Sequence, residues 1–280
     1  MIFRRYYARL AKPVKRILMC SPEHFTVRYR INVHMKDGVN KAVAMKQWLL
    51  LKATLEQCGA EIEVMPGVAE HPDLVFAANA AVLKGKQAYL AHFKPPERQS
   101  ERGYFMAALE ALGFSCGGRE DLVHEGAGDA LWTDGRKRVL FAAHGQRTDW
   151  AVYPDLVEQL GGDIRLVDCH LIDPRWYHLD TAFCPLTEEL GIWHPAAFSE
   201  KSRKAMAAEM ELIPVSERDA MNFACNMVVV GKSVVLHKGS VGTVTELRKR
   251  GFVCHEVDLS EFIKAGGSAK CLTLSLDSAL

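Results

Sequence analysis

One cysteine of the chain stands where its thiol could act as a nucleophile. Cys271 follows a Gly-Gly turn in A-G-G-S-A-K-C-L-T-L, and the alternating run C-L-T-L-S-L that it begins is typical of a strand. The thiol is therefore expected at the mouth of that strand, beside exposed backbone amides. A thiolate attacks an electrophilic carbon when a histidine or a cationic substrate lowers the thiol pKa. A buried core cysteine is the alternative, and spacing alone favours it.

A histidine and several carboxylates lie in segments that could face the same pocket. In Y-H-L-D, His178 and Asp180 are alternate residues and would point to one face of a strand. Glu125 and Asp129 flank G-A-G, which lets the backbone approach a ligand closely, and either could orient His178. A strand histidine and solvated turn acids are the alternatives for each residue alone. Together with a thiol, these groups suffice for attack on a carbon held by cation-binding acids.

The elements that must position these residues follow a repeated order of helix, glycine and strand. Each glycine suits a left-handed helix C-cap. The segments are LEQCGAEIEV from Leu55, LEALGFSC from Leu109, LVEQLGGDIRLV from Leu156 and LRKRGFVCHEV from Leu247. A fifth helix, from Ser199, feeds its strand without the glycine. Five such units at spacings of several tens of residues predict an α/β fold with modules arranged around an axis.

A doubly wound sheet would also contain helix–glycine–strand turns. The phosphate-binding patterns G-x-G-x-x-G and G-x-x-x-x-G-K-[ST] are both missing, which argues against a nucleotide cofactor. No two of the eight cysteines form a C-x-x-C pair, so zinc clips and redox dithiols are not expected. We expect the protein in a reducing compartment. With 280 residues and 49% hydrophobic content, the chain can form a core without disulfides or metal.

Charge and hydropathy narrow the class of partner. A net charge of +1 provides no basic surface for nucleic acid, and no apolar stretch is long enough to span a bilayer. A small molecule is the expected partner, and a homo-oligomer is compatible with the sequence. The first sixteen residues hold six Arg or Lys and no acid, a bias that also occurs in mitochondrial presequences. We expect a basic lead at 1–15, one catalytic domain at 16–280 and a cytoplasmic location, with the mitochondrion as the alternative.

Six motifs, in order, resemble the arginine dihydrolase branch of the amidinotransferase/arginine deiminase superfamily over nearly the whole chain, from about Arg16 to Leu276. They are P-D-x-V-F-x-A-N-A, E-R-Q, E-G-x-G-D, H-L-D-T-x-F-C-P-L, N-F-A-C-N and A-G-G-x-A-K-C-L-T-L. The resemblance implies the pentein fold, a five-bladed α/β propeller of ββαβ modules, which arginine deiminases and dimethylarginine dimethylaminohydrolases share. It implies no metal and no organic cofactor.

Carried over residue by residue, the resemblance assigns the chemical roles. Cys271 resembles the nucleophile, His178 the general acid/base and Glu125 the residue that holds the imidazole. Asp180 would hold the guanidinium by paired hydrogen bonds. Asn79 stands where deiminases and dimethylargininases carry a second guanidinium-binding Asp.

Further positions match substrate contacts. Asn32, in R-I-N-V-H-M, resembles a substrate-contacting Asn of the dihydrolases, and Asp129 is one more substrate-binding candidate. Arg98 and Arg147 match arginines that would hold an α-carboxylate, a task suited to a guanidinium fork. The chain departs from the pattern at His34, where the dihydrolases carry Trp, and this leaves the specificity of that loop open.

The expected activity is covalent, Cys-dependent hydrolysis of the guanidinium group of arginine to ornithine, ammonia and carbon dioxide. An arginine deiminase or dimethylargininase would stop at citrulline, and an amidinotransferase would transfer the amidino group to an amine. A non-enzymatic pentein that serves as a binding protein is a further alternative. The intact Cys271, His178 and Glu125 argue against it.

Overall fold

The computed structural model describes residues 14–133 and 138–276. The strands of this part form five three-stranded sheets, in which the middle strand pairs antiparallel with one neighbour and parallel with the other. The sheets are β15 (Leu274–Ser275), β1 (Arg16–Cys20) and β2 (Glu61–Met65); β3 (Ala81–Lys84), β4 (Gln87–Leu90) and β5 (Ser115–Gly117); β6 (Ala130–Trp132), β7 (Val139–His144) and β8 (Arg165–His170); β9 (Phe183–Pro185), β10 (Leu190–Trp193) and β11 (Glu211–Pro214); β12 (Val228–Val230), β13 (Ser233–His237) and β14 (Val253–Val257).

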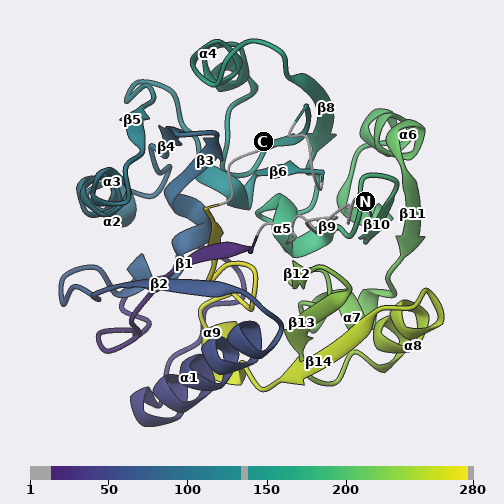
Figure 1. The fold of residues 1–280 in the computed structure, drawn as a ribbon, viewed down its shortest axis with the longest axis horizontal. Helices are drawn as coiled ribbons and strands as arrows, with labels where there is room; N and C mark the ends of the chain where they lie inside the picture. Colours follow the sequence, from purple (N-terminus) through teal and green to yellow (C-terminus); the bar gives the residue numbers. More distant parts are fainter. Residues whose placement is uncertain (1–13, 134–137, 277–280) are drawn as a thin grey trace, which may run out of the picture.

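A helix joins the two parallel strands of each sheet, as parallel pairing requires. These crossover helices are α1 (Lys41–Gln57), α3 (Glu101–Ala111), α4 (Tyr153–Gln159), α6 (Glu200–Glu209) and α8 (Val241–Lys249). Figure 1 shows the five sheets around a common centre with these helices on the rim. Because β15 pairs with β1, the end of the chain closes the ring at its beginning. The predicted five-module α/β propeller is confirmed.

The shorter helices connect these modules. They are α2 (Pro96–Gln99), α5 (Leu179–Ala182), α7 (Glu217–Met221), α9 (Ser260–Ile263) and the 3-10 turns η1 (Pro72–Val75), η2 (Ala77–Ala80), η3 (Gly126–Gly128), η4 (Trp150–Val152) and η5 (Pro195–Ala197). Several of them lie at the inner ends of strands, and Figure 1 shows α5 near the centre of the ring. The segments that carry the candidate site residues are therefore mostly short turns.

Local sequence explains where the long helices begin and end. Asn40 accepts a hydrogen bond from the backbone of Val43 at the start of α1, and Ser199 does the same for Ser202 at the start of α6. The glycines that follow α1, α3, α4 and α8 have positive φ, the left-handed conformation expected of a C-cap. All five predicted helix-to-strand units are present.

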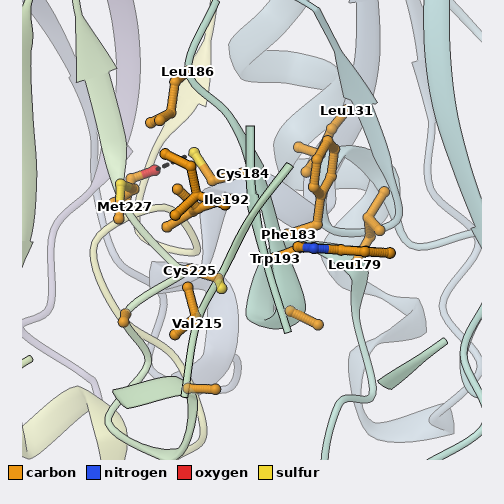
Figure 2. Close-up of a cluster of buried hydrophobic side chains, with 14 of the residues drawn as sticks. Leu131, Leu179, Phe183, Cys184, Leu186, Ile192, Trp193, Val215, Cys225 and Met227 are labelled. Atoms are coloured by element: carbon orange, nitrogen blue, oxygen red, sulfur yellow. Dashed lines mark hydrogen bonds between the residues drawn. The ribbon is translucent and has the colours of Figure 1, made fainter. Parts of the chain in front are cut away.

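Apolar side chains pack between neighbouring modules. The largest cluster joins the third, fourth and fifth modules, and Figure 2 shows Phe183 and Ile192 of the fourth module among Leu131 of the third and Met227 beside the fifth. Other clusters join the first module to the fifth and to the second. Each module therefore completes the core of the next, and the packing between modules is complete only in the closed ring.

Two local expectations were wrong. His178 and Asp180 do not alternate along a strand, because Leu179–Ala182 forms the short helix α5 that His178 precedes. Cys271 lies in a turn, since β15 begins only at Leu274. The G-A-G segment forms a single 3-10 turn, in which Gly126 has a positive φ of 59°.

In the described ranges, no helix combines the length and the apolar character needed to cross a membrane. Residues 1–13 of the predicted basic lead lie outside the described residues. The division of the chain at residue 16 stays a prediction.

Candidate active site

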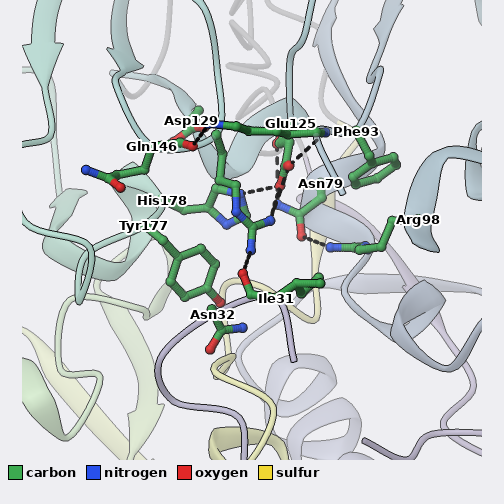
Figure 3. A network of polar contacts seen from close by, with 12 residues as sticks. Ile31, Asn32, Asn79, Phe93, Arg98, Glu125, Asp129, Gln146, Tyr177 and His178 are labelled. Carbon is green, nitrogen blue, oxygen red and sulfur yellow. Dashed lines mark hydrogen bonds and ion pairs between the residues drawn. The ribbon is translucent and has the colours of Figure 1, made fainter. Parts of the chain in front are cut away.

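A buried carboxylate pairs with two basic side chains at the centre of the ring. Glu125 has no exposed surface, and its Oε2 lies 2.7 Å from Nε2 of His178. Nη1 of Arg147 donates to the same oxygen at 2.9 Å, and both basic side chains are buried. Figure 3 shows His178 beside Glu125. Because a buried charge is stable only when it is paired, Glu125 fixes the imidazole and the guanidinium relative to each other.

The charge of Glu125 follows from these partners. Burial alone would raise the pKa of this carboxyl group, but the Arg147 charge and the His178 hydrogen bond outweigh burial and lower the pKa from 4.5 to about 2. Glu125 is therefore ionised at neutral pH. The ionised carboxylate holds the imidazole of His178 in one orientation through their contact at 2.7 Å, where the ring can act as acid and base.

The candidate nucleophile lies against a second buried acid. Sγ of Cys271 is 3.4 Å from Oδ2 of Asp180, whose other oxygen has no hydrogen-bond partner among the described residues. Burial, and after it the Asp180 charge, raises the pKa of Cys271 well above its usual value of 9.0. A cation beside Asp180 would cancel that negative charge and favour the thiolate.

Asn79 lies between two buried charged groups. Its Oδ1 accepts a hydrogen bond from Nη1 of Arg98 at 3.0 Å, and its Nδ2 donates to the backbone oxygen of Glu125 at 3.3 Å. Arg98 donates from Nε and Nη2 to the two oxygens of Glu101, at 2.9 and 2.8 Å, and lies over the ring of Phe93 (Figure 3). Because Glu101 pairs with the guanidinium of Arg98, this arginine is held in place and supports the Asn79 amide through a hydrogen bond.

Two glycines allow Asn79 to approach the catalytic candidates. A Cβ on Gly126 would lie 2.4 Å from the backbone oxygen of Asn79, and φ at Gly126 is positive. A Cβ on Gly128 would lie 2.4 Å from Nδ2 of Asn79 and 3.3 Å from the ring of His178. Only glycine permits this packing at both positions.

The loop that precedes α1 closes over the same region. Nη2 of Arg147 donates to the backbone oxygen of Ile31 at 2.6 Å. Nδ2 of Asn32 donates to the backbone oxygen of Ala265 at 3.0 Å, which ties the loop to the A-G-G segment before Cys271. Asn32, which we predicted to contact the substrate, thus also holds the loop in place.

His34 anchors the loop at a third point. Its Nε2 lies 2.7 Å from the backbone oxygen of Arg175, and its ring packs edge-on against Phe223 at 5.0 Å between centroids. Burial lowers the pKa of His34, so the neutral ring is favoured at neutral pH. His34 does not border the pocket, so the departure from Trp alters the loop's anchorage rather than the pocket wall.

These contacts leave a pocket with a cavity volume of about 10 Å³, room for about one water molecule. The described residues that line it are Ile31, Asn32, Met35, Asp73, Phe76, Asn79, Arg98, Arg147, Tyr177, Ala265 and Cys271. Five of the predicted site residues therefore border one cavity. His178 and Asp180 are connected to it through Glu125 and Cys271. In this conformation the cavity is too small for a ligand larger than water.

Asp129 lies behind the pocket. Its Oδ2 accepts a hydrogen bond from Thr148 at 2.7 Å, and its Oδ1 accepts one from the backbone of Leu179 at 3.1 Å. Thr148 also accepts a hydrogen bond from the backbone of Glu125 at 3.2 Å. Because both of its oxygens are used, Asp129 fixes the backbone beside His178 and Glu125, where we had expected direct contact with substrate.

Sequence reasoning missed two buried polar residues of the site. Asp73 is 2% exposed and borders the pocket, and its Oδ1 has no hydrogen-bond partner in the described part of the chain. Asn226 has no exposed surface and donates to Sγ of Cys271. Both belong to motifs that the resemblance rests on, P-D-x-V-F-x-A-N-A and N-F-A-C-N, and those motifs were the available signal.

Within residues 14–133 and 138–276, no three His, Cys, Asp or Glu side chains are grouped so that they could hold a metal ion. The donors of the site are one thiol, one imidazole and carboxylates, of which Glu125 and Glu101 are already paired with arginines. The chemistry that this arrangement supports uses the thiol as nucleophile and the imidazole as acid and base.

Five ββαβ modules around one centre, with a cysteine on the wall of the pocket and a histidine–glutamate pair joined to that wall through Arg147, define a pentein of the catalytic type. A family model described as eukaryotic N,N dimethylarginine dimethylhydrolase matches residues 21–277. The chain belongs to this family.

Curated relatives include proteins with two different activities. The bifunctional arginine dihydrolase/ornithine cyclodeaminase ArgZ from Synechocystis sp. is 40% identical over 268 residues, which are 92% of this chain and 37% of ArgZ. The chain thus spans little more than a third of that relative. The N(G),N(G)-dimethylarginine dimethylaminohydrolase from Mycobacterium tuberculosis is 35% identical over 96% of this chain and 88% of its own length.

Solved structures agree with this assignment. The N-terminal domain of ArgZ, crystallised with a covalently bound reaction intermediate, has a TM-score of 0.90 and 38% identity, over 94% of this chain and 98% of that one. A dimethylarginine dimethylaminohydrolase structure, with 18% identity and a TM-score of 0.79 over 94% of this chain and all of its own, supports the fold.

Glu125→Gln is expected to lower the free energy of unfolding at pH 7 by about 3 kcal/mol, because the shift of its pKa from 4.5 to about 2 is worth that much. The folded-state pKa is lowered, so this stabilisation is present above pH 4.5 and is lost as the pH falls towards 2. Denaturant unfolding of both proteins across that range measures the difference, which should narrow on acidification.

Glu120→Gln is the matched control, because the Glu120 side chain is 74% exposed and pairs with Arg102 at 3.2 Å on the surface. It should change stability by less than about 0.5 kcal/mol at any pH. A Glu125→Gln difference as small as that of the control would contradict the buried pairing.

Proposed function

We propose that the protein is a Cys271-dependent hydrolase of the guanidinium group of arginine that proceeds to ornithine, ammonia and carbon dioxide. The observation that carries this proposal is the contact of the Cys271 thiol with buried Asp180, 3.4 Å apart, beside a pocket that also contains the neutral amide of Asn79. This arrangement suits a cation whose central carbon is the target of a sulfur nucleophile.

Two buried acids supply the attraction for a cation. Asp180 and Asp73 each have one oxygen without a partner in the described part of the chain. Burial raises the pKa of Asp180 from 3.8 to about 6, although the Lys270 charge opposes it, and burial also raises the pKa of Asp73. A planar cation with several N–H groups would pair with both oxygens and recover the cost of burial.

Cation binding and nucleophile activation are then one event. The guanidinium neutralises the Asp180 charge that raises the pKa of Cys271, the thiol gives its proton to the imidazole of His178, and the thiolate adds to the guanidinium carbon. His178, paired with Glu125, protonates the leaving nitrogen, and ammonia departs from the tetrahedral adduct. Water deprotonated by the same imidazole then attacks the planar intermediate, breaks the C–S bond and releases a ureido product.

Arg147 is the better candidate for the α-carboxylate. Arg98 already uses Nε, Nη1 and Nη2 in hydrogen bonds to Glu101, Asn79 and a backbone oxygen. Among the described residues, Arg147 bonds through Nη1 and Nη2, to Glu125 and to the loop, and its Nε has no hydrogen-bond partner there. We therefore assign carboxylate recognition to Arg147 and the support of Asn79 to Arg98, where the sequence had suggested the same role for both.

The neutral amide at Asn79 is the reason to expect the second hydrolysis. An Asp at this position would add a negative charge that the neutral ureido group of citrulline could not balance. The amide keeps one N–H and one lone pair beyond its bonds to Arg98 and Glu125, so it can contact a guanidinium or a carbonyl oxygen. Citrulline could then be attacked by Cys271 a second time.

The comparisons support this proposal and preserve an alternative. ArgZ is described as an arginine dihydrolase, whereas the matching family model and the mycobacterial relative are described as dimethylarginine hydrolases. Hydrolysis of methylated arginine, with citrulline as the end product, is therefore the second candidate. Amidino transfer, a cytoplasmic or mitochondrial location and a homo-oligomer stay predictions from sequence.

Cys271→Ser should reduce turnover of arginine to background while leaving the unfolding transition within about 1 kcal/mol of the wild type, because a hydroxyl is far less acidic than a thiol. Ammonia release and thermal unfolding measure the two effects. Cys225→Ser is the matched control, since Cys225 is buried outside the pocket. Turnover that survives in Cys271→Ser and not in Cys225→Ser would identify a different nucleophile.

Agmatine, which has the guanidinium and no carboxylate, should be a poor substrate. Leaving a buried charge without its partner costs about 2–5 kcal/mol, a factor of tens to thousands in kcat/KM. In Arg147→Lys the preference for arginine over agmatine should shrink, because the substitution lowers kcat/KM mainly for arginine, the substrate that has the carboxylate. Arg119→Lys, on an exposed surface pair, should keep the wild-type preference. Equal use of both substrates by the wild type would refute the carboxylate assignment.

The end product separates the two candidate functions. Wild-type protein incubated with isotopically labelled arginine should give ornithine with two ammonia molecules for each arginine, whereas Asn79→Asp should accumulate citrulline. Mass analysis of the products over time measures both. Stoichiometric citrulline from the wild type would refute the dihydrolase proposal, and faster release of citrulline from dimethylarginine than from arginine would favour the second candidate.

A further inference from the structure

Asn226 joins the segment between α7 and β12 to the nucleophile, 45 residues further along the chain. Its Oδ1 accepts the backbone N–H of Cys271 at 3.1 Å, and its Nδ2 lies 3.0 Å from Sγ of Cys271 and 3.1 Å from the backbone oxygen of Asp180. Its own backbone oxygen accepts a hydrogen bond from the N–H of Lys270 at 3.3 Å. One fully buried side chain therefore contacts both the main chain and the sulfur of the nucleophile.

These contacts fix which way round the amide lies. A backbone N–H can only donate, so the side-chain atom facing the N–H of Cys271 must be the oxygen. The nitrogen then faces Sγ and the backbone oxygen of Asp180, and its two hydrogens are directed at those two acceptors. The sulfur is thus an acceptor on this side.

The remaining neighbours of the sulfur determine where its proton points. Because Asn226 donates to the sulfur, the thiol hydrogen is directed elsewhere, and Oδ2 of Asp180 at 3.4 Å is the acceptor in reach. The other charged or titratable groups that act on this sulfur are Tyr177 and Lys270. Neither has a hydrogen bond to it of the kind that Asn226 makes.

The turn that presents Asn226 has an uncommon backbone. Phe223 has φ of 58°, the only positive φ of a non-glycine residue in the described part of the chain. Its backbone oxygen accepts the N–H of Asn226 at 3.0 Å, and its ring packs against His34 of the loop that covers the pocket. Bulky residues rarely adopt this conformation, and such strain is retained where the surroundings demand it, commonly at functional sites.

We propose that Asn226 is a positioning residue for the nucleophile, whose amide N–H stabilises the thiolate of Cys271 and whose amide oxygen holds the backbone of that residue in place. This inference rests on the proposed thiol chemistry and adds to it a residue without acid–base function of its own. Its donor acts alongside the cation, since both favour negative charge on sulfur.

The test is the pKa of the Cys271 thiol in Asn226→Ala and Asn226→Leu, the second being close to the shape of asparagine without donor or acceptor. A hydrogen bond to a charged acceptor is worth about one pKa unit or more, so the pKa should rise by about one unit in both variants. Thiolate absorbance against pH, with Cys271→Ser subtracted, measures it without turnover. At neutral pH kcat should fall about tenfold, and part of the loss should be recovered at higher pH.

Asn222→Ala is the matched control from the same N-F-A-C-N motif. Asn222 donates to the backbone oxygen of Lys238 and to Ser240, away from the pocket. It should leave the thiol pKa and kcat unchanged. Thermal unfolding of all variants reports whether the fold persists, and the isosteric Asn226→Leu provides the result if the alanine variant unfolds.

The outcomes separate this inference from the proposed function. An unchanged thiol pKa in folded Asn226→Leu, with kcat lowered equally at every pH, would show a merely structural role and overturn the inference. Wild-type turnover that survives complete alkylation of Cys271 by iodoacetamide would instead overturn the thiol chemistry on which the inference rests. A raised pKa in both Asn226 variants, with Asn222→Ala unchanged, supports it.

Discussion

The site depends on one buried carboxylate that pairs with two basic side chains. Glu125 hydrogen-bonds both His178 and Arg147, and all three side chains are buried. If the glutamate were neutral, the guanidinium of Arg147 would be a buried cation without this partner. Arg147 in turn holds the covering loop through Ile31, so the same charge that orients the imidazole also ties down the entrance. Catalytic geometry and pocket closure therefore share one electrostatic origin.

The propeller brings to one point residues that no single element could hold together. Asn79, Glu125, His178 and Cys271 lie in turns that join different modules, and their contacts span up to 91 positions of sequence. Packing of each module against the next fixes these turns. Strand β15, which pairs with β1 to close the ring, follows Cys271 in the sequence. The proposed chemistry thus requires the closed ring, because the turns between its modules carry the residues of the site.

The sequence predicted features that arise from local physics. Five helix-to-strand units, four of them with a glycine at the end of the helix, follow from backbone preferences and apolar periodicity, and the motif order placed the catalytic candidates. The alternation of His178 and Asp180 was misleading because α5 is a short helix whose hydrogen bonds depend on tertiary neighbours. The N-F-A-C-N motif contained Asn226, but its contact with Cys271 and the pairing of Arg147 with Glu125 were not accessible, since both join segments that are separate in the sequence. The position of Asp129 behind the pocket likewise depends on Thr148 and Leu179.

The two proposed hydrolyses make opposite electrostatic demands on one pocket. A cation cancels the Asp180 charge and lowers the barrier to thiolate formation, whereas the neutral ureido group leaves that charge in place. Because Asn79 is neutral, it adds no negative charge to the pocket in the second step. The charge of Lys270 opposes that of Asp180. The amide N–H of Asn226 stabilises the thiolate whichever substrate is bound. A donor independent of substrate charge is what the second step needs, because citrulline cannot supply the cation that activates the first.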